Sequence, residues 1–307
     1  MSDAGGLTLG TAAVAAGSVG AAVARTRQAL EEAGVPGPRR EAEELYAALV
    51  RRGTSAGWLE REAPIAGTVL AQLEAAARRR AAGWPQAYAT GVANFRGHWL
   101  RVDRRVLIPR PETEGLVDLV LEWVRRASAV RVSPPVVVDV GTGSGAIAVA
   151  LALEAPALRV IATDRSAAAL EVARLNVEAH GVGGRVELKC GHLLEPLAGE
   201  RVDAVVSNPP YVATEEWERL EARVRDFEPR EALDGGPDGL VPTRELVASA
   251  HPALRPGGLL ALEVDARRAG ATAGLTAAAG LDSCDVIQDL FGRPRFVRAR
   301  RPADGSH

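Results

Sequence analysis

The chain has 307 residues, of which 47% are hydrophobic and 25% charged, so disorder of the whole chain is excluded and there is room for one large domain with an appendage or for two domains. The formal net charge of -2 gives no global positive field for a long nucleic acid or an anionic membrane. The two cysteines, Cys190 and Cys284, show no CxxC spacing. They indicate neither a disulfide framework nor a zinc site, and they favour a reducing, cytoplasmic setting.

The first segments predict a small helical domain that precedes a larger one. Residues 1–20 are rich in Gly and Ala and are expected to be loose; they lack the basic start of a secretion signal. Residues 21–85 place apolar and charged positions at helical spacing, as in "EAEELYAALVRR". Residues 86–110 contain the alternating "FRGHWLRV" and lead into the proline-rich "LIPRPE", and they predict a hairpin linking the two domains. No apolar run is long enough to span a bilayer, so no membrane association is expected.

From residue 111 to about residue 300, strand-like and helix-like segments alternate. "VVVDV" precedes "AIAVALALEA", "RVIATD" precedes "SAAALEVARLNVEAH", and "RVELKC", "RVDAVVS" and, after a turn at "RPGG", "LLALEV" follow. The strands are apolar throughout, which indicates a parallel sheet covered by helices on both faces. The fold class is therefore α/β.

A glycine-rich turn connects the first strand of this region to its helix, in "VVVDVGTGSGAIAVALA". Glycines allow a sharp turn and a close approach of a ligand to the backbone, and the helix N-terminus offers free N–H groups. The spacing is G-x-G-x-G with Asp139 two residues earlier. The dinucleotide fingerprint is G-x-G-x-x-G, and its looser last position tolerates the Ala found at position 146. Asp139 can attract a cationic ligand group or form hydrogen bonds within the loop, and the sequence favours neither role.

Asp164 ends the next predicted strand, about twenty residues beyond the glycines. An acid at this position can accept hydrogen bonds from both ribose hydroxyls of an adenosine. As an isolated residue it would serve equally to cap the helix that begins near Ser166. Beside the glycine-rich turn, ribose binding is the favoured interpretation.

The segment "SNPPYV" follows the buried strand "RVDAVV". Pro209 and Pro210 end the strand and hold two backbone carbonyls rigidly, Asn208 adds a side-chain carbonyl, and Tyr211 adds a flat face. Together they predict a planar slot for an –NH2 group, either of an amide or of a nucleobase. Fixed acceptors can draw such a nitrogen towards tetrahedral geometry and disperse the developing charge, so no protein nucleophile or metal is needed.

These motifs, in this order, resemble those of a known family. "VLIPRPETE", "DVGTGSGAIAVALA", "SNPPYV", "FEPREALDGGPDGL" and "RPGGLLALEV" are similar to the protein-(glutamine-N5) methyltransferases that modify peptide chain release factors. The resemblance covers roughly residues 21–300. It implies a Rossmann-like class I methyltransferase domain, a helical N-terminal domain that docks the substrate, and a linking β-hairpin. It also implies methyl transfer from S-adenosylmethionine to the glutamine amide of the Gly-Gly-Gln loop of a release factor in the cytoplasm.

The resemblance also implies roles for particular residues. Catalysis would fall to Asn208, Pro209, Pro210 and Tyr211, which would hold the glutamine amide. The cofactor would contact Asp139, Gly141, Thr142, Gly143, Ser144, Gly145, Asp164, His192, Leu193 and Asn208. The segment from Arg110 to Thr113 would line a lid over the cofactor, and its residues also fit the start of a helix with Glu114 in the first turn.

The chain departs from the family pattern at two places. His192 stands where the family usually has an Asp that reaches the adenine amino group, and Leu193 next to it can pack on the adenine face. Ala87 and Ala89 replace a usual Gln and Ile before the hairpin. Three alternatives stay open at this stage: a ribosomal-protein glutamine as substrate, an adenine amino group as substrate, and a non-catalytic cofactor-binding module.

Overall fold

The computed structural model describes residues 17–128 and 133–303, and the chain divides into one compact unit up to residue 90 and another from residue 91 onwards. Most of the loose start expected over residues 1–20 lies outside the described residues. Within them, Ser18 caps the first helix by accepting a hydrogen bond from the N–H of Ala21 at 3.2 Å. Residues 19 and 20 therefore already belong to the helical unit, because a serine cap outweighs the glycine at position 20.

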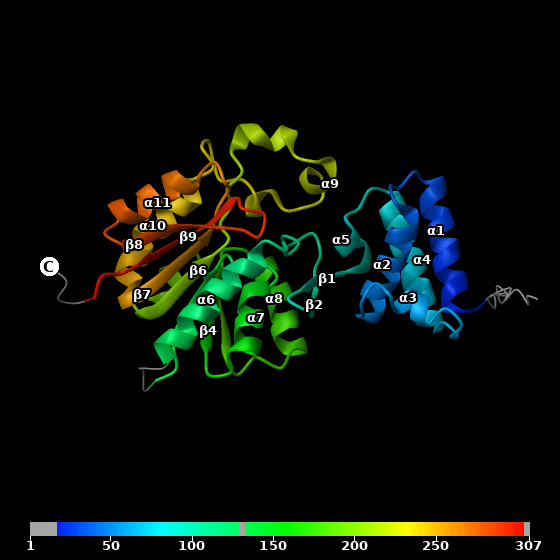
Figure 1. Ribbon diagram of the computed structural model, residues 1–307, viewed down its shortest axis with the longest axis horizontal. Coiled ribbons are helices and arrows are strands. Elements are labelled where there is room, and N and C mark those ends of the chain that lie inside the picture. Colours follow the sequence, from blue (N-terminus) through cyan, green and yellow to red (C-terminus); the bar gives the residue numbers. More distant parts are fainter. Residues whose placement is uncertain (1–16, 129–132, 304–307) are drawn as a thin grey trace, which may run out of the picture. The chain divides into compact units, whose positions relative to one another are not determined.

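The first unit is helical throughout its described part (Figure 1). Its helices are α1 (Val19–Glu32), α2 (Pro38–Val50), α3 (Ala56–Leu59), α4 (Gly67–Ala81) and α5 (Gln86–Thr90). Leu30 of α1, Leu45 of α2 and Leu73 of α4 are fully buried in one shared core. The side chain of Arg80, in the last turn of α4, pairs with Glu41 of α2 at 2.8 Å, and this ion pair connects the two helices.

The hairpin between the predicted domains is shorter than residues 86–110. Residues 86–90 form α5, and the hairpin consists of β1 (Val92–Phe95) and β2 (His98–Arg101) in antiparallel register. Arg96 and Gly97 both have positive φ, as a two-residue hairpin turn requires. The prolines after the hairpin form an irregular segment that leads into α6 (Thr113–Ser128), with Glu114 in its first turn as expected.

The second unit is built on a seven-stranded sheet with the order β5-β4-β3-β6-β7-β9-β8. The strands are β3 (Val136–Val140), β4 (Arg159–Asp164), β5 (Val186–Cys190), β6 (Val202–Ser207), β7 (Leu254–Glu263), β8 (Asp282–Gln288) and β9 (Pro294–Arg300). The pairs among β3 to β7 are parallel, whereas β9 pairs antiparallel with both β7 and β8. The sheet is thus mixed rather than purely parallel.

Helices cover both faces of this sheet (Figure 1). The main ones are α6, α7 (Ala146–Glu154), α8 (Ala167–Ala179), α10 (Val241–Ala253) and α11 (Ala269–Ala278). Alternate residues of β3 enter different cores: Val137 packs with α6 and α7, and Val138 packs with α10 and α11. This alternation explains why the central strands are apolar at every position.

One predicted turn lies inside a strand. The "RPGG" segment belongs to β7, where the register against β6 shifts between Val202 and Ala204. Gly257 has a φ of 74°, and an added Cβ on Gly258 would lie 2.7 Å from the Arg255 carbonyl oxygen. The glycines therefore accommodate an irregularity within a continuous strand rather than a reversal of the chain.

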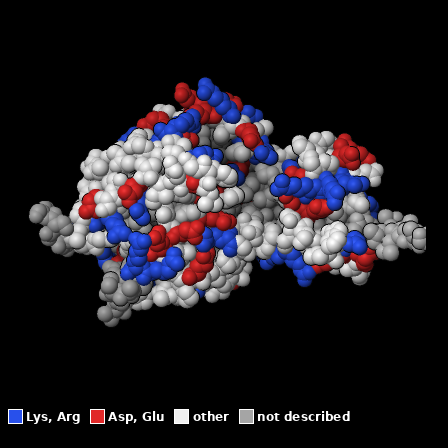
Figure 2. All heavy atoms as spheres, viewed as in Figure 1, with Lys and Arg blue, Asp and Glu red and all other residues white. Residues whose placement is uncertain are grey.

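Opposite charges are interspersed on the face of each unit that Figure 2 shows. This agrees with the formal net charge of -2 of the whole chain. Among the described residues, no helix is both long and apolar enough to cross a membrane.

Candidate active site at the carboxyl ends of the central strands

Three neighbouring parallel strands end together at one edge of the sheet. Val140 at the end of β3 is in register with Thr163 of β4 and with Ser207 of β6. The Ser207 hydroxyl donates to the Val140 carbonyl at 2.7 Å and ties two of these ends together. Since β4 lies on one side of β3 and β6 on the other, this edge contains the topological switch point where α/β sheets bind ligands.

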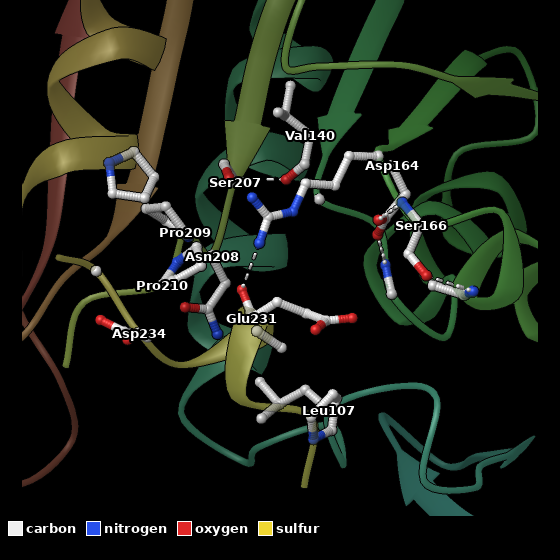
Figure 3. A pocket seen from close by; sticks show the side chains of 18 of the residues that line it. Leu107, Val140, Asp164, Ser166, Ser207, Asn208, Pro209, Pro210, Glu231 and Asp234 are labelled. Carbon is white, nitrogen blue, oxygen red and sulfur yellow. Dashed lines mark hydrogen bonds between the residues drawn. The ribbon is translucent and has the colours of Figure 1, made fainter. Parts of the chain in front are cut away.

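A cavity of about 740 Å³ lies at this switch point. Figure 3 shows Asn208, Pro209 and Pro210 on one side of it and Asp164 and Ser166 on another. Of the predicted site residues, the structure brings together Gly141, Gly143, Asp164, His192, Leu193, Asn208, Pro209 and Pro210 in its lining. Asp139, Thr142, Ser144, Gly145 and Tyr211 do not line it.

The glycine-rich loop has a left-handed backbone at each of its three glycines. Gly141, Gly143 and Gly145 have φ values of 71°, 54° and 81°, which side chains rarely tolerate. Gly145 also approaches α8, since an added Cβ would lie 3.3 Å from that of Ala173. At Gly141 and Gly143 nothing lies within 4 Å of an added Cβ, so the backbone there is open to a ligand.

Asp139 lies fully buried beneath this loop. Its Oδ2 accepts hydrogen bonds from the Thr142 hydroxyl at 2.6 Å and the Ala148 N–H at 3.2 Å, so the loop-bonding role is observed. Its Oδ1 has no hydrogen-bond partner, which leaves an acceptor for a further group. Burial raises the pKa of Asp139 to about 7, although the two hydrogen bonds to the carboxylate oppose this rise.

Asp164 connects the loop after β3 to the end of β4. Its Oδ2 accepts from the Gly143 N–H and its Oδ1 from the Ser166 N–H, both at 2.9 Å. The cap of α8 is not Asp164 but Ser166, whose hydroxyl accepts from the Ala169 N–H at 3.2 Å. Each carboxylate oxygen of Asp164 keeps further acceptor capacity towards the cavity.

His192 and Leu193 follow β5 at another side of the cavity. Leu193 has a φ of 46°, and its carbonyl accepts from the Thr163 hydroxyl at 2.9 Å, which fixes the turn. His192 is exposed, and its Nε2 lies 3.2 Å from a carboxylate oxygen of Glu245 on α10. The imidazole therefore has a protein partner in addition to its position at the cavity.

The segment from Asn208 to Tyr211 continues β6 and packs closely against a later loop. The Val212 N–H donates to the Leu233 carbonyl at 2.9 Å, and the Gly235 N–H donates to the Val212 carbonyl at 2.7 Å. An added Cβ on Gly235 would lie 2.7 Å from the Pro210 carbonyl oxygen. Gly235, the first glycine in "EALDGG", thus permits a close approach to the Pro210 backbone that a side chain would prevent.

Tyr211 differs from its predicted place as a wall of the slot. Its side chain is partly buried near the carboxylate of Glu263 and does not line the cavity. Burial and then the negative charge of Glu263 raise the pKa of Tyr211. The contacts of the ring near Glu263 therefore keep it away from the cavity, although the preceding Pro210 lines that cavity.

The segment from Arg110 to Thr113 also differs from its predicted place as a cofactor lid, since it does not line the cavity. Arg110 pairs with the buried carboxylate of Glu228, which also accepts from the Ile108 N–H at 3.1 Å. Thr113, buried at the start of α6, hydrogen-bonds both Asn208 and Glu263. These residues therefore support the site through buried contacts, such as that of Thr113 with Asn208, without lining the cavity.

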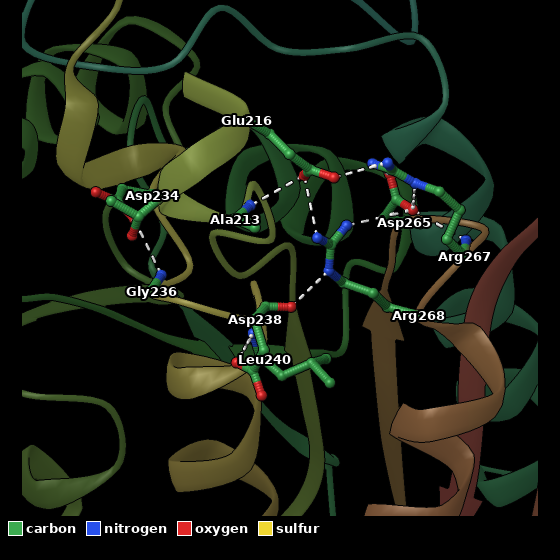
Figure 4. Close-up of polar contacts among 10 residues, drawn as sticks. Ala213, Glu216, Asp234, Gly236, Asp238, Leu240, Asp265, Arg267 and Arg268 are labelled. Carbon is green, nitrogen blue, oxygen red and sulfur yellow. Dashed lines mark hydrogen bonds and ion pairs between the residues drawn. The ribbon is translucent and has the colours of Figure 1, made fainter. Parts of the chain in front are cut away.

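Another polar network holds the loop that follows Tyr211 (Figure 4). This loop contains the short helices η2 (Thr214–Arg219), α9 (Ala222–Arg225) and η3 (Arg230–Ala232). Glu216 of η2 accepts from Arg267 at 2.7 Å and from Arg268 at 3.0 Å, and Arg268 also donates to the Asp238 carbonyl at 2.8 Å. The network ties both ends of the loop to the segment after β7.

Comparison with known proteins identifies the family. The profile "PrmC N-terminal domain" matches residues 21–91, and "Methyltransferase small domain" matches residues 127–224. The chain is 42% identical to a "Release factor glutamine methyltransferase" from Cereibacter sphaeroides, over 94% of this chain and 99% of that protein. The chain belongs to the release factor glutamine methyltransferase family.

A second relative agrees with this assignment, and one solved structure shares the fold. A "Release factor glutamine methyltransferase" from Streptomyces coelicolor is 42% identical, over 92% of this chain and 97% of that protein. The solved "hMettl16 catalytic domain", in complex with "MAT2A 3'UTR hairpin 6", covers 78% of this chain and 83% of its own with a TM-score of 0.54. Because the two sequences are only 13% identical, this likeness shows a common methyltransferase fold and says nothing of the substrate.

Proposed function

We propose that this family member transfers the methyl group of S-adenosylmethionine to the side-chain amide nitrogen of the Gly-Gly-Gln glutamine of a peptide chain release factor. One observation carries the proposal: Asn208, Pro209 and Pro210 at the end of β6 share a cavity with the glycine-rich loop after β3. An amide-holding segment beside a methyl-donor site is the arrangement that this reaction needs. The sequence identity to the curated relatives supports the same substrate.

The residues around the cavity fit the cofactor. The open backbone at Gly141 and Gly143, which line the cavity, suits the methionine part of the cofactor. The other predicted residues of this region, Asp139, Thr142, Ser144 and Gly145, do not line the cavity and would act by shaping the loop. Asp164 suits the ribose, while Leu193 and His192 suit the adenine. When bound, S-adenosylmethionine supplies an electrophilic methyl group.

The protein's own part in the reaction is to orient and polarise an amide. The Asn208 side-chain carbonyl and the Pro209 backbone carbonyl accept the two hydrogens of the glutamine –NH2 group. These contacts hold the nitrogen in the direction of attack and stabilise the positive charge that develops on it. Rigid prolines keep the acceptors in place with little loss of entropy on binding. A substrate that takes part in translation termination puts this activity in the cytoplasm.

A methyl-transfer assay tests the proposal. Purified protein is mixed with methyl-labelled S-adenosylmethionine and a release factor that carries either the intact Gly-Gly-Gln loop or its Gln→Ala version. We expect label only in the intact factor, at one glutamine located by mass spectrometry. Equal labelling of both factors, or labelling of an adenine-containing RNA instead, would contradict the proposal. Cofactor binding without transfer to any of these substrates would identify a non-catalytic module.

A further inference from the structure

A buried hydrogen-bond chain lies directly behind the proposed amide-binding segment. The Asn208 Nδ2 lies 3.2 Å from the Thr113 Oγ1, and that oxygen lies 2.7 Å from Oε2 of Glu263. Thr113 begins α6 and is 5% exposed, whereas Glu263 ends β7 and is 1% exposed. Three segments that are far apart in the sequence thus meet at one threonine hydroxyl.

The chemistry of the three groups fixes the direction of this chain. An ionised carboxylate can only accept, so the single hydroxyl hydrogen of Thr113 must point to Glu263. The Thr113 oxygen then has only lone pairs to offer towards Asn208, and these select the –NH2 end of the Asn208 amide. The carbonyl end of Asn208 is consequently left for the cavity, which Asn208 lines.

We propose that Glu263 is a positioning residue that acts through Thr113 to hold the Asn208 amide with its carbonyl oxygen towards the substrate –NH2 group. This inference rests on the proposed function, because it assigns an acceptor role to that oxygen. Without these two hydrogen bonds, the Asn208 amide is free to turn by 180°. It would then present its two N–H donors to the substrate –NH2 group, which also has only donors to offer. Such an arrangement repels the substrate amide rather than aligning it.

The surroundings of Glu263 make this chain sensitive to pH. Burial raises the pKa of Glu263 to about 7, and Glu112 before α6 acts in the same direction. The Thr113 hydroxyl, Arg295 of β9 and the Tyr211 hydroxyl favour the ionised form. A protonated Glu263 no longer requires the Thr113 hydrogen, and Thr113 can then donate to the Asn208 carbonyl. The alignment of Asn208 is therefore lost as the pH falls below about 7.

Single-turnover methyl transfer to the release factor tests the inference. Thr113→Val removes the hydroxyl and keeps the shape, so we expect the rate to fall about tenfold or more, with the Kd for S-adenosylhomocysteine unchanged. Thr113→Ser restores the hydroxyl and should recover most of that rate. Thr272→Val is a matched control, since Thr272 on α11 is fully buried and its hydroxyl has no partner. It should leave the rate unchanged.

The pH profile supplies the readout that a merely structural role would not change. Asp139, whose pKa is also raised to about 7, titrates in both proteins, so the readout is the ratio of the wild-type rate to the Glu263→Gln rate, which should fall below a pH of about 7, the pKa of Glu263. A ratio that stays constant between pH 6 and 8, or equal rates for Thr113→Val and Thr113→Ser, would overturn the inference. Should Glu263→Gln fail to fold, the comparison of the two Thr113 variants decides alone. A wild-type protein that transfers no methyl group would instead refute the proposed function.

Discussion

The Gly143 N–H donates to the Asp164 carboxylate at 2.9 Å, so the glycine-rich loop after β3 is held by the residue that ends β4. The same carboxylate accepts the Ser166 N–H at the start of α8. Asp164 therefore orders the loop before any ligand binds, and its remaining lone pairs face the cavity. Asp164 thus has two roles: it holds the loop proposed to bind the methionine part of the cofactor, and it is proposed to bind the ribose.

Replacement of Asp164 by Ala should weaken cofactor binding, because the side chain both orders the glycine-rich loop and is proposed to bind the ribose. Loss of charge-assisted hydrogen bonds of this kind costs about 1.5–3 kcal/mol, so we expect the Kd for S-adenosylhomocysteine to rise at least tenfold in calorimetric titrations. Asp285→Asn is a suitable control, because Asp285 is an acid that pairs with Arg298 at 2.6 Å and neither residue lines the cavity. An unchanged Kd in Asp164→Ala would contradict the ribose assignment.

Asn208→Ala should separate binding from chemistry. The cofactor contacts of the glycine-rich loop and Asp164 stay intact, so the Kd for S-adenosylhomocysteine should change by less than about threefold. The amide acceptor is lost, and removal of one fixed active-site hydrogen-bond partner costs about 3 kcal/mol in the transition state, or roughly 10²-fold in kcat. Turnover close to that of the wild type in the release-factor assay would remove Asn208 from the mechanism.

Local sequence patterns predicted the parts of the site that lie within single loops. The glycine spacing required positive φ values, and the position of Asp164 at a strand end put it beside the glycines in a parallel sheet. Asn208 and the two prolines likewise followed directly from their place after a buried strand. Each of these predictions used residues close in sequence and one general rule of α/β topology.

The buried contacts of Thr113 and Glu263 next to Asn208 could not be predicted in this way. Thr113 and Glu263 are 150 positions apart, and only the strand order brings α6 against β7. A signal was nevertheless present, since a glutamate within the apolar "LLALEV" must have buried partners. The strand β8 carried no such signal, because its exposed and half-buried positions do not alternate regularly. Its antiparallel pairing with β9 was missed for that reason.

The buried Asp139 should make stability depend on pH. Its pKa is raised to about 7 in the folded protein from about 3.9 in the unfolded chain, so its contribution to stability is complete below pH 4 and is lost as the pH rises to 7. Asp139→Asn removes this titration. The free energy of unfolding of the variant, minus that of the wild type, should therefore increase from pH 4 to pH 7 by up to about 1.4 kcal/mol per pH unit.

Urea denaturation at several pH values measures this difference. Glu263 titrates in both proteins and cancels in the subtraction, which leaves the effect of Asp139 alone. Asp103→Asn provides a contrast of opposite sign, because the hydrogen bond from Arg105 lowers the pKa of Asp103 and its contribution to stability is lost as the pH falls. A pH-independent difference for Asp139→Asn would mean that Asp139 ionises normally inside the fold.

Gly235→Ala should disturb the amide-binding segment without touching any catalytic side chain. The new Cβ would lie 2.7 Å from the Pro210 carbonyl oxygen and 2.8 Å from that of Gly239, and neither backbone atom can move freely. Either the "NPPY" backbone or the "DGG" loop must shift, and a displacement of about 1 Å in a positioned group can lower kcat by roughly 10²-fold. Gly270→Ala is the matched control, since nothing lies within 4 Å of an added Cβ in that helix and alanine favours helices by about 1 kcal/mol. We expect Gly235→Ala to lose turnover and unfold at lower urea concentration, while Gly270→Ala keeps full turnover and equal or higher stability. If Gly235→Ala instead kept full turnover, the close contact between this loop and the prolines would not be what holds the amide acceptors in place.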